Sequence, residues 1–341
     1  MSATTQPTDF SDLYTDLMNR VRADTSVTAT SNQAKRYINT ALHDMHIGFG
    51  EKFEWAERSA ILVTQPEYTT GTVTITQGST TLTGSGTAWN TANAFGVNNT
   101  RAGGKIVING GAEVYEVSAV GSDTSITLTS AYVSEDASAA NYVYFEDEYA
   151  LANDFLRPLD LQNFDTNGDI ELIGRNKFRF RYPRNKTTGK PVVATLLNKP
   201  FSGNTTPIRK VRFHKPPDAA YSIPYAYVTS NLAVDASGNE QAQLSSDSDE
   251  PIVSLQYRHV IVLHALKNWY RDRKDDVRSQ EVNAEFTDLM IRITGDTEIG
   301  QNRPQIRPRR TPYVARARRP YGGRGATRRF TTGDAFDEIR D

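Results

Sequence analysis

The stretch 72-TVTITQGSTTLTGSGTAW-89 alternates threonine with apolar residues around a cluster of turn-forming residues, and it indicates the fold class of this 341-residue chain. Thr72–Thr76 and Thr80–Thr83 are typical of β-strands, because successive side chains of a strand point to opposite faces. Gln77–Gly78–Ser79 separates the two runs and favours a tight turn. The stretch therefore predicts a β-hairpin.

The same composition, rich in Thr, Ser, Gly, Val and Ile, extends over Thr69–Tyr144. Further strands with turn residues between them are predicted at Lys105–Ile108, Ala112–Val120, Ser125–Leu128 and Tyr142–Phe145. About six strands in so short a segment predict a compact all-β barrel or sandwich. Trp89 is the predicted large core residue, and the polar stretch Trp89–Arg101 is a predicted exposed loop.

Helical periodicity appears at both ends of the chain, where apolar residues recur three or four positions apart. Helices are predicted over Asp9–Asp24, from Ser31 to Gly50, from Pro251 to Tyr270, and over Val277–Thr294. Thr8 or Asp9 can cap the first helix, and Pro251 suits a first helical turn. We therefore expect a four-helix bundle built from both chain ends.

Short alternating runs outside the Thr-rich segment predict a second, small β-sheet. Its strands are Phe53–Thr64, Val192–Leu197, Arg209–Phe213 and Ser222–Val228, and Ser230–Glu250 is a predicted long polar loop. The expected fold class is α+β: the four-helix bundle, the small β-sheet domain, the inserted all-β barrel or sandwich, and an extended basic C-terminal tail. The predicted segments are residues 1–68 (helical hairpin and first strand), 69–145 (inserted β module), 146–250 (β-sheet domain), 251–296 (second helical hairpin) and 297–341 (tail).

The tail is the strongest candidate for a binding site. Residues 301–330 contain ten arginines and no lysine, aspartate or glutamate, so their net charge is +10. Because the whole chain has a net charge of −1, the rest of the chain has a net charge of about −11. Guanidinium groups bind carboxylates, phosphates and carbonyls, and they stack on aromatic rings. The candidate binding residues are Arg303, Arg307, Arg309, Arg310, Tyr313, Arg316, Arg318, Arg319, Tyr321, Arg324, Arg328, Arg329 and Phe330. Protein docking, nucleic-acid contact and a merely solubilising tail are all open interpretations.

Motifs for catalysis are not evident in the sequence. Neither His43 with His46 nor His259 with His264 has the spacing of a zinc-protease helix. The stretch 165–176 begins like a calcium loop, but Ile170 stands where that loop needs glycine. With no cysteine, and with no nucleophile or phosphate-loop motif, the sequence predicts a protein that is not an enzyme and uses no metal or cofactor.

No apolar run approaches the length of a membrane span, and the N-terminal residues 1–8 lack the pattern of a secretion signal. The sequence therefore predicts no membrane contact and assembly in a cytoplasm.

Three stretches carry a resemblance to a known family. They are 257-YRHVIVLHALKNWYRDRKDDVRSQEVNAEF-286, 34-AKRYINTAL-42 and the strand Phe53–Thr64, and together they resemble the head-to-tail adaptor proteins of tailed bacteriophages. The run 72–89 is similar to β modules of phage structural proteins. In that family a helical bundle joins a small β domain, about twelve copies form a ring beneath the portal, and the C-terminal segment grips the portal.

The resemblance implies a structural adaptor (connector) in the neck of a phage virion, assembled in the cytoplasm of a bacterial host. Its implied partners are further copies in a ring, a portal protein above, a tail or stopper/nozzle protein below, and packaged DNA that passes without sequence-specific binding. The larger β module and the arginine-rich tail depart from the family pattern. Two alternatives stay open: another virion ring or collar component whose β module contacts a fibre or host surface, and a DNA-binding protein that uses the basic tail.

Overall fold

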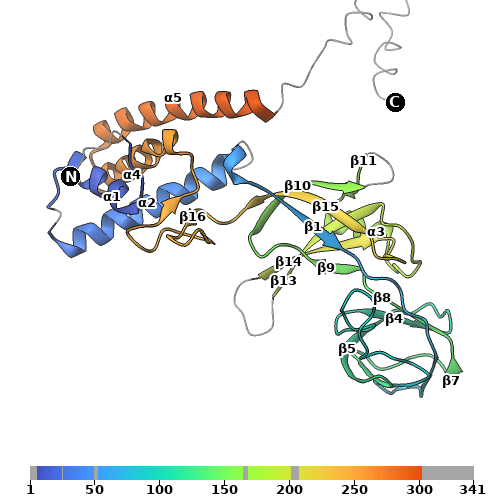
Figure 1. The fold of residues 1–341 in the computed structure, drawn as a ribbon. Helices are drawn as coiled ribbons and strands as arrows, with labels where there is room; N and C mark the ends of the chain where they lie inside the picture. The colour runs from blue at the N-terminus through green and yellow to red at the C-terminus, as the bar shows by residue number, and fades with distance from the viewer. Residues whose placement is uncertain (1–5, 25, 50–52, 164–167, 201–206, 302–341) are drawn as a thin grey trace, which may run out of the picture.

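The computed structural model describes residues 6–24, 26–49, 53–163, 168–200 and 207–301, and these contain eighteen strands and five α-helices. The described chain is mostly β and elongated (Figure 1). A helical region lies at one end, a curled sheet lies at the other, and two small sheets lie between them. Each of the three parts has its own buried apolar cluster.

The curled sheet has seven antiparallel strands in the order β7-β2-β3-β6-β5-β4-β8. They are β2 Thr72–Ile75, β3 Thr81–Ser85, β4 Lys105–Ile108, β5 Tyr115–Ser122, β6 Ser125–Leu128, β7 Ala137–Ala140 and β8 Tyr142–Phe145. The predicted hairpin around Gly78 is confirmed, since β2 pairs with β3. Trp89 is fully buried, as predicted.

The expectation of a closed barrel or a sandwich is wrong, because the sheet is an open half-barrel. Its end strands β7 and β8 pair with β2 and β4 but not with each other. Only Asn141 separates these two strands in sequence, so the chain itself draws the opposite ends of the sheet together. Bulges between β5 and β6 and between β2 and β7 provide the bend.

Two four-stranded sheets share one core in the middle of the molecule. The first has the order β1-β15-β10-β11, with β1 Glu57–Val63, β15 Ser222–Thr229, β10 Phe155–Asn163 and β11 Gly168–Asp169. The second has the order β12-β13-β14-β9, with β12 Glu171–Leu172, β13 Val193–Pro200, β14 Pro207–His214 and β9 Glu148–Ala150. The four predicted strands all exist, but they do not form one sheet: β1 pairs with β15, whereas β13 and β14 pair with each other.

The helical region contains α1 Phe10–Arg20, α2 Thr28–Phe49, α4 His259–Asp272 and α5 Asp276–Gln301. The predicted four-helix bundle is wrong. Helix α4 is central, contacts α1, α2 and α5, and buries the consecutive residues 260–266 on all sides. A helix of a four-helix bundle buries only one apolar stripe and exposes its other side to solvent. Helix α4 is apolar on all sides, so other elements of the chain cover it all round.

Strand residues complete the same core, which further distinguishes it from a bundle. Ser230–Glu250, predicted as a loop, contains part of a three-stranded sheet formed by β16 Ala233–Val234, β17 Glu240–Gln241 and β18 Glu250–Pro251. Leu232 and Leu244 are buried against the helices. Pro251 lies in β18 and does not begin a helix; the short 3-10 turn Leu255–Tyr257 precedes α4 instead.

The N-terminal elements follow their sequence signals more closely. Asp9 caps α1, where its carboxylate accepts a hydrogen bond from the Asp12 amide at 2.9 Å. A 3-10 turn, Glu54–Ala56, leads into β1.

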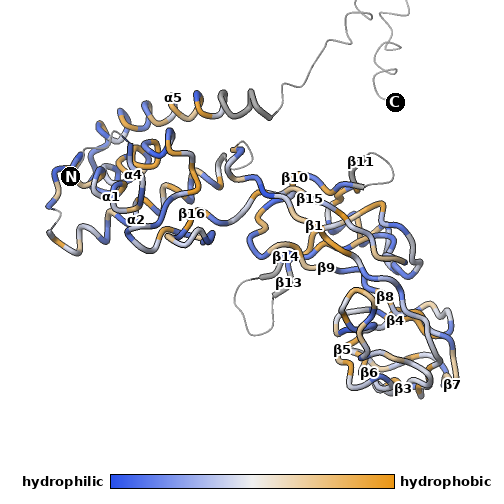
Figure 2. The backbone as a smooth tube through the Cα atoms, viewed as in Figure 1, coloured by the Kyte–Doolittle hydropathy of each residue, from blue (hydrophilic) through white to orange (hydrophobic). Residues whose placement is uncertain are grey.

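Coloured by hydropathy, the backbone shows apolar segments alternating with polar ones in the curled sheet (Figure 2).

His264 makes the helical core sensitive to acid. Burial, with a smaller contribution from Lys267, lowers the pKa of His264 from 6.5 to about 4, while Asp44 acts in the opposite direction. The ring packs edge-on against Phe286 at a centroid distance of 4.7 Å. A histidine that stays neutral in the folded state destabilises the fold as pH falls, because the unfolded chain takes up its proton first.

We therefore expect His264 to account for a decrease of about 2–3 kcal/mol in unfolding free energy between pH 7 and pH 4. Urea unfolding of the wild type and of His264→Phe across this range measures the effect, since the variant should be destabilised less on acidification. His43→Gln, at an exposed histidine, is the control. An equal acid destabilisation of the wild type and His264→Phe would contradict the assignment.

Candidate functional site: a basic surface around α3

The binding residues predicted from the arginine-rich tail all lie outside the described residues. They are Arg303, Arg307, Arg309, Arg310, Tyr313, Arg316, Arg318, Arg319, Tyr321, Arg324, Arg328, Arg329 and Phe330. Their role stays a prediction.

A second basic segment, which the sequence interpretation missed, lies in the middle of the molecule. Residues 172–217 contain twelve lysines and arginines and no aspartate or glutamate. This segment holds the short helix α3 Arg175–Arg181 together with β13 and β14. A count of charged residues along the chain would have found it.

Helix α3 is fixed on the middle sheets by aromatic packing. Phe178 is buried against Ile173 and Val193. The ring of Tyr182, which follows the helix, stacks on His214 at a centroid distance of 3.6 Å. The Asn185 side chain donates to the Phe213 carbonyl at 2.6 Å. A helix of two turns has little stability of its own, so these contacts hold it in place.

The outer side of α3 combines an aromatic ring with cations. Phe180 is 89 % exposed, whereas Phe178 is buried on the opposite side of the helix. The cations of α3 are all exposed: Arg175, Lys177, Arg179 and Arg181. Within the described part of the chain, none of the four has an ion-pair partner. Their charges are therefore available to an anionic ligand.

Neighbouring basic groups extend this surface toward the curled sheet. Arg184 pairs with Glu113 at 3.1 Å, and Lys186 donates to the Gly111 carbonyl at 3.0 Å. Burial, reinforced by the nearby Lys215 charge, lowers the pKa of His214, so its ring is neutral at pH 7. The surface around α3 can thus attract an anionic ligand through its cations and stack a flat ligand group on the exposed Phe180 ring.

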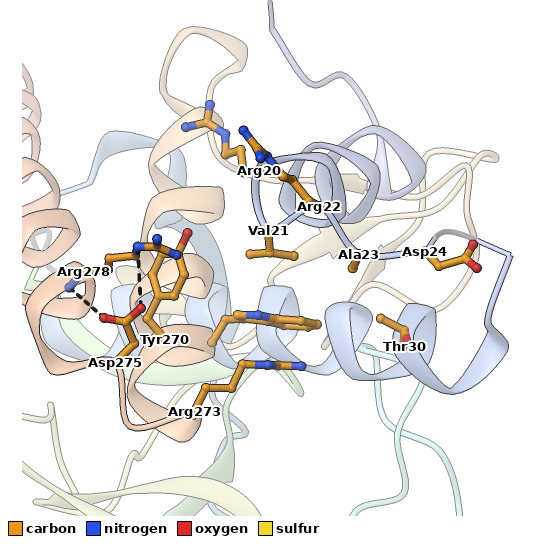
Figure 3. Close-up of a pocket in the computed structure, with 11 residues that line it drawn as sticks. Arg20, Val21, Arg22, Ala23, Asp24, Thr30, Tyr270, Arg273, Asp275 and Arg278 are labelled. Carbon is orange, nitrogen blue, oxygen red and sulfur yellow. Dashed lines mark hydrogen bonds and ion pairs between the residues drawn. The ribbon is translucent and has the colours of Figure 1, made fainter.

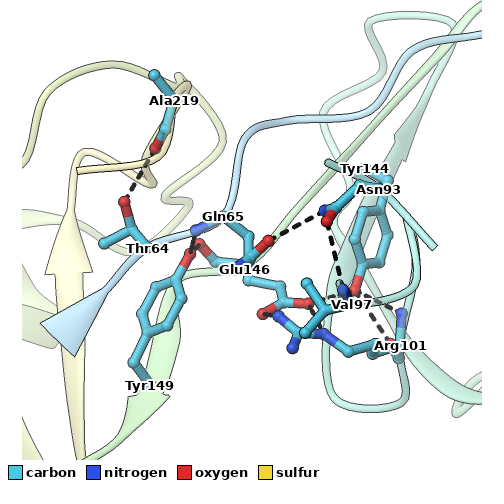
Figure 4. Close-up of polar contacts among 9 residues, drawn as sticks. All are labelled: Thr64, Gln65, Asn93, Val97, Arg101, Tyr144, Glu146, Tyr149 and Ala219. Carbon is cyan, nitrogen blue, oxygen red and sulfur yellow. Dashed lines mark hydrogen bonds and ion pairs between the residues drawn. The ribbon is translucent and has the colours of Figure 1, made fainter. Parts of the chain in front are cut away.

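The curled sheet is joined to the middle sheets by a network of partly buried polar contacts (Figure 4). The Arg101 guanidinium binds the Glu146 carboxylate, which also accepts from the Tyr144 hydroxyl at 2.9 Å. The Tyr149 hydroxyl accepts from the Gln65 amide at 3.1 Å and donates to the Glu146 carbonyl at 3.2 Å. Burial raises the pKa of both tyrosines, so they remain neutral donors.

Asp147 is the most buried charge of this joint. Its carboxylate accepts from Lys105 Nζ of β4 at 2.5 Å and from Arg212 Nε of β14 at 2.7 Å. The Asp147 side chain is completely buried, and that of Lys105 is only 10 % exposed. One carboxylate therefore ties a strand of the curled sheet to a strand of the middle sheet.

A pocket of about 770 Å³ lies between α1 and the end of α4 (Figure 3). Four arginines line it, but three of them already have partners. Arg273 stacks on Trp269 at 3.6 Å, Arg278 pairs with Asp275 at 3.6 Å, and Arg20 pairs with Asp16 at 3.1 Å. The pocket is therefore a weaker anion site than the surface of α3.

Within the described ranges, no group of three or more His, Asp or Glu side chains is placed to hold a metal ion. No described helix is long and apolar enough to cross a membrane. No protein-family model matches the sequence. The curated proteins contain no match to it either.

Proposed function

We propose that this protein is a structural head-to-tail adaptor of a phage virion neck. The observation that carries the proposal is the elongated order of three separately packed parts, two of which are held together by a joint of polar contacts around the buried Asp147. A connector between two large assemblies needs such rigidity along its length, and the joint at Asp147 supplies it between two of the parts. The function is docking, without bond chemistry.

In this proposal about twelve copies form a closed ring, as head-to-tail contacts between identical subunits can do. The ring docks on a portal protein through the arginine-rich C-terminal residues, and a tail or stopper/nozzle protein binds below. Packaged DNA passes through the channel of the ring without sequence-specific binding. The location is the head-tail interface of the virion.

Charge distribution supports a chain that binds acidic surfaces at two places. Residues 172–217 and 301–330 are two long basic segments without acidic residues, and the remainder of the chain is strongly acidic because the total charge is only −1. Opposite charges on one subunit favour association between copies and with acidic partners. Repetition around a ring multiplies these weak contacts.

Removal of residues 302–341 is expected to leave a folded protein that no longer binds the portal, because the candidate portal contacts are removed while α5 is kept intact. Negative-stain imaging and mass photometry of the truncated and full-length proteins, each mixed with a portal ring, measure the difference in binding. Circular dichroism controls for folding. Undiminished stacking of the truncated protein on the portal would refute the role of the tail.

DNA binding is the second candidate function, and the acid-free segment 172–217 favours it beyond the tail alone. A DNA-binding protein would bind far more weakly as salt rises, because each phosphate contact releases about one counterion. Weak binding that is insensitive to salt would exclude it.

A further inference from the structure

Phe180 is the most exposed large apolar side chain of the described chain, at 89 %. In an α-helix, two positions correspond to a rotation of about 200°, so Phe178 and Phe180 point to nearly opposite sides. Phe178 faces the core, and Phe180 therefore stands on the outer crest of α3. An exposed phenylalanine at such a crest has no role in the packing of this chain.

The cations of α3 flank this ring on both sides. By helical geometry Arg179 lies on one side of Phe180, Lys177 and Arg181 lie on the other, and Arg175 lies farther round the helix beyond Arg179. No acidic residue occurs between Glu171 and Asp218 to neutralise them. The result is an aromatic ring with positive charges on both sides.

The geometry is fixed before any ligand binds. Contacts of Phe178, Tyr182 and Asn185 with β13 and β14 hold the helix on a sheet. The ring and the flanking charges are thus presented together, which lowers the ordering cost on binding.

We propose that the outer surface of α3 binds single-stranded nucleic acid, with Phe180 stacking on an unpaired base and the flanking cations contacting phosphates. Single-strand sites combine such a ring with a basic surface, because every base has a flat face and every nucleotide has a phosphate. A protein-docking patch would instead place further apolar side chains around the ring, and α3 exposes no second one. This inference does not depend on the proposed adaptor function.

The first test measures binding of the full-length protein to a labelled oligothymidylate of about fifteen nucleotides, within the usual range of single-strand sites, by fluorescence anisotropy. Phe180→Ala is expected to weaken binding about tenfold, which corresponds to the removal of one stacked base. Phe180→Tyr should retain most of the affinity. Phe95→Ala, at a 54 % exposed phenylalanine of the loop between β3 and β4, is the matched control and should bind like the wild type.

Because the arginine-rich tail also attracts nucleic acid, the second test maps the contact. Photo-crosslinking of an oligonucleotide that carries iodouracil, followed by mass spectrometry, should label peptides of residues 175–182 in the wild type and not in Phe180→Ala. Replacing Arg175, Lys177, Arg179 and Arg181 together by glutamine should reduce the slope of log affinity against log salt by about 0.7 for each phosphate that the variant no longer binds.

Three results would overturn the inference. They are equal affinities of Phe180→Ala and Phe95→Ala, crosslinks confined to residues 301–341, and preferential weakening of duplex binding in Phe180→Ala. A change in subunit number on mass photometry, with nucleic-acid binding unaltered, would assign Phe180 to contact with a second copy instead. Portal binding by Phe180→Ala is expected to be normal, so a failure here is distinguishable from a failure of the adaptor proposal.

Discussion

Replacing Trp89 with alanine is expected to lower the unfolding free energy of the curled sheet by about 3–5 kcal/mol, the usual cost of removing a buried aromatic side chain. Trp89 is fully buried, and its indole Nε1 donates to the Tyr142 hydroxyl at 2.9 Å. The two rings also pack edge-on at 5.8 Å. Alanine would leave a cavity and remove a hydrogen bond to Tyr142 at the same time.

The space around the indole shows how tightly this site is filled. A Cβ added at Gly84 would lie 2.8 Å from the tip of the Trp89 ring. Trp89 is the largest fully buried side chain of this core, and closure of the described sheet by pairing of β7 with β8 is absent. The stability lost through a cavity at this site is therefore not restored by strand pairing around a closed barrel.

Hydrogen exchange followed by mass spectrometry measures this effect by region. Peptides from β2 to β8 should be less protected in Trp89→Ala, while peptides from α4 keep their protection, because the helical region has a separate core. Trp89→Phe should be milder, since it keeps a ring and the Tyr142 hydroxyl still donates to the Thr70 carbonyl at 2.7 Å. Wild-type protection of β2 to β8 in Trp89→Ala would contradict the role of Trp89 as the core residue.

Local patterns in the sequence predicted individual strands and hairpins well, and predicted their assembly poorly. Alternation around Gly78 sufficed for β2 and β3, because a hairpin is a local structure. It did not reveal that β1 pairs with β15 or that β14 pairs with β9, because these partners lie far apart in the chain and such pairing leaves no local signal. The domain boundaries predicted from the sequence remain predictions.

Helix α3 shows why the basic surface escaped detection. In the stretch 177-KFRFR-181 cations and phenylalanines alternate, which is the pattern of a strand with both rings on one face. The chain is helical here, so the rings separate and Phe180 becomes exposed. The charge of the segment can be counted in the sequence, but the combination of a free ring with free cations depends on the helix.

The largest single-charge effect is expected at Asp147. Its conversion to asparagine should lower the unfolding free energy by about 3–5 kcal/mol, because it leaves the buried Lys105 ammonium and the Arg212 guanidinium without their shared carboxylate. Urea unfolding followed by circular dichroism measures the destabilisation. In addition, the curled sheet and the middle sheets should unfold in separate transitions, since Asp147 links β4 to β14.

Two control variants separate the buried charge from charge in general. Glu113→Gln removes the acid of the exposed pair with Arg184, whose side chains are 45 % and 59 % exposed, and should cost less than about 1 kcal/mol. The double change Asp147→Leu with Lys105→Met should recover part of the stability, because it removes the buried ammonium together with its partner and leaves only the partly exposed Arg212 without its carboxylate. If Asp147→Asn lowered the unfolding free energy no more than Glu113→Gln does, the Asp147 link between β4 and β14 would not stabilise the protein, and the joint would be held by the Arg101–Glu146 pair and the tyrosine hydroxyls.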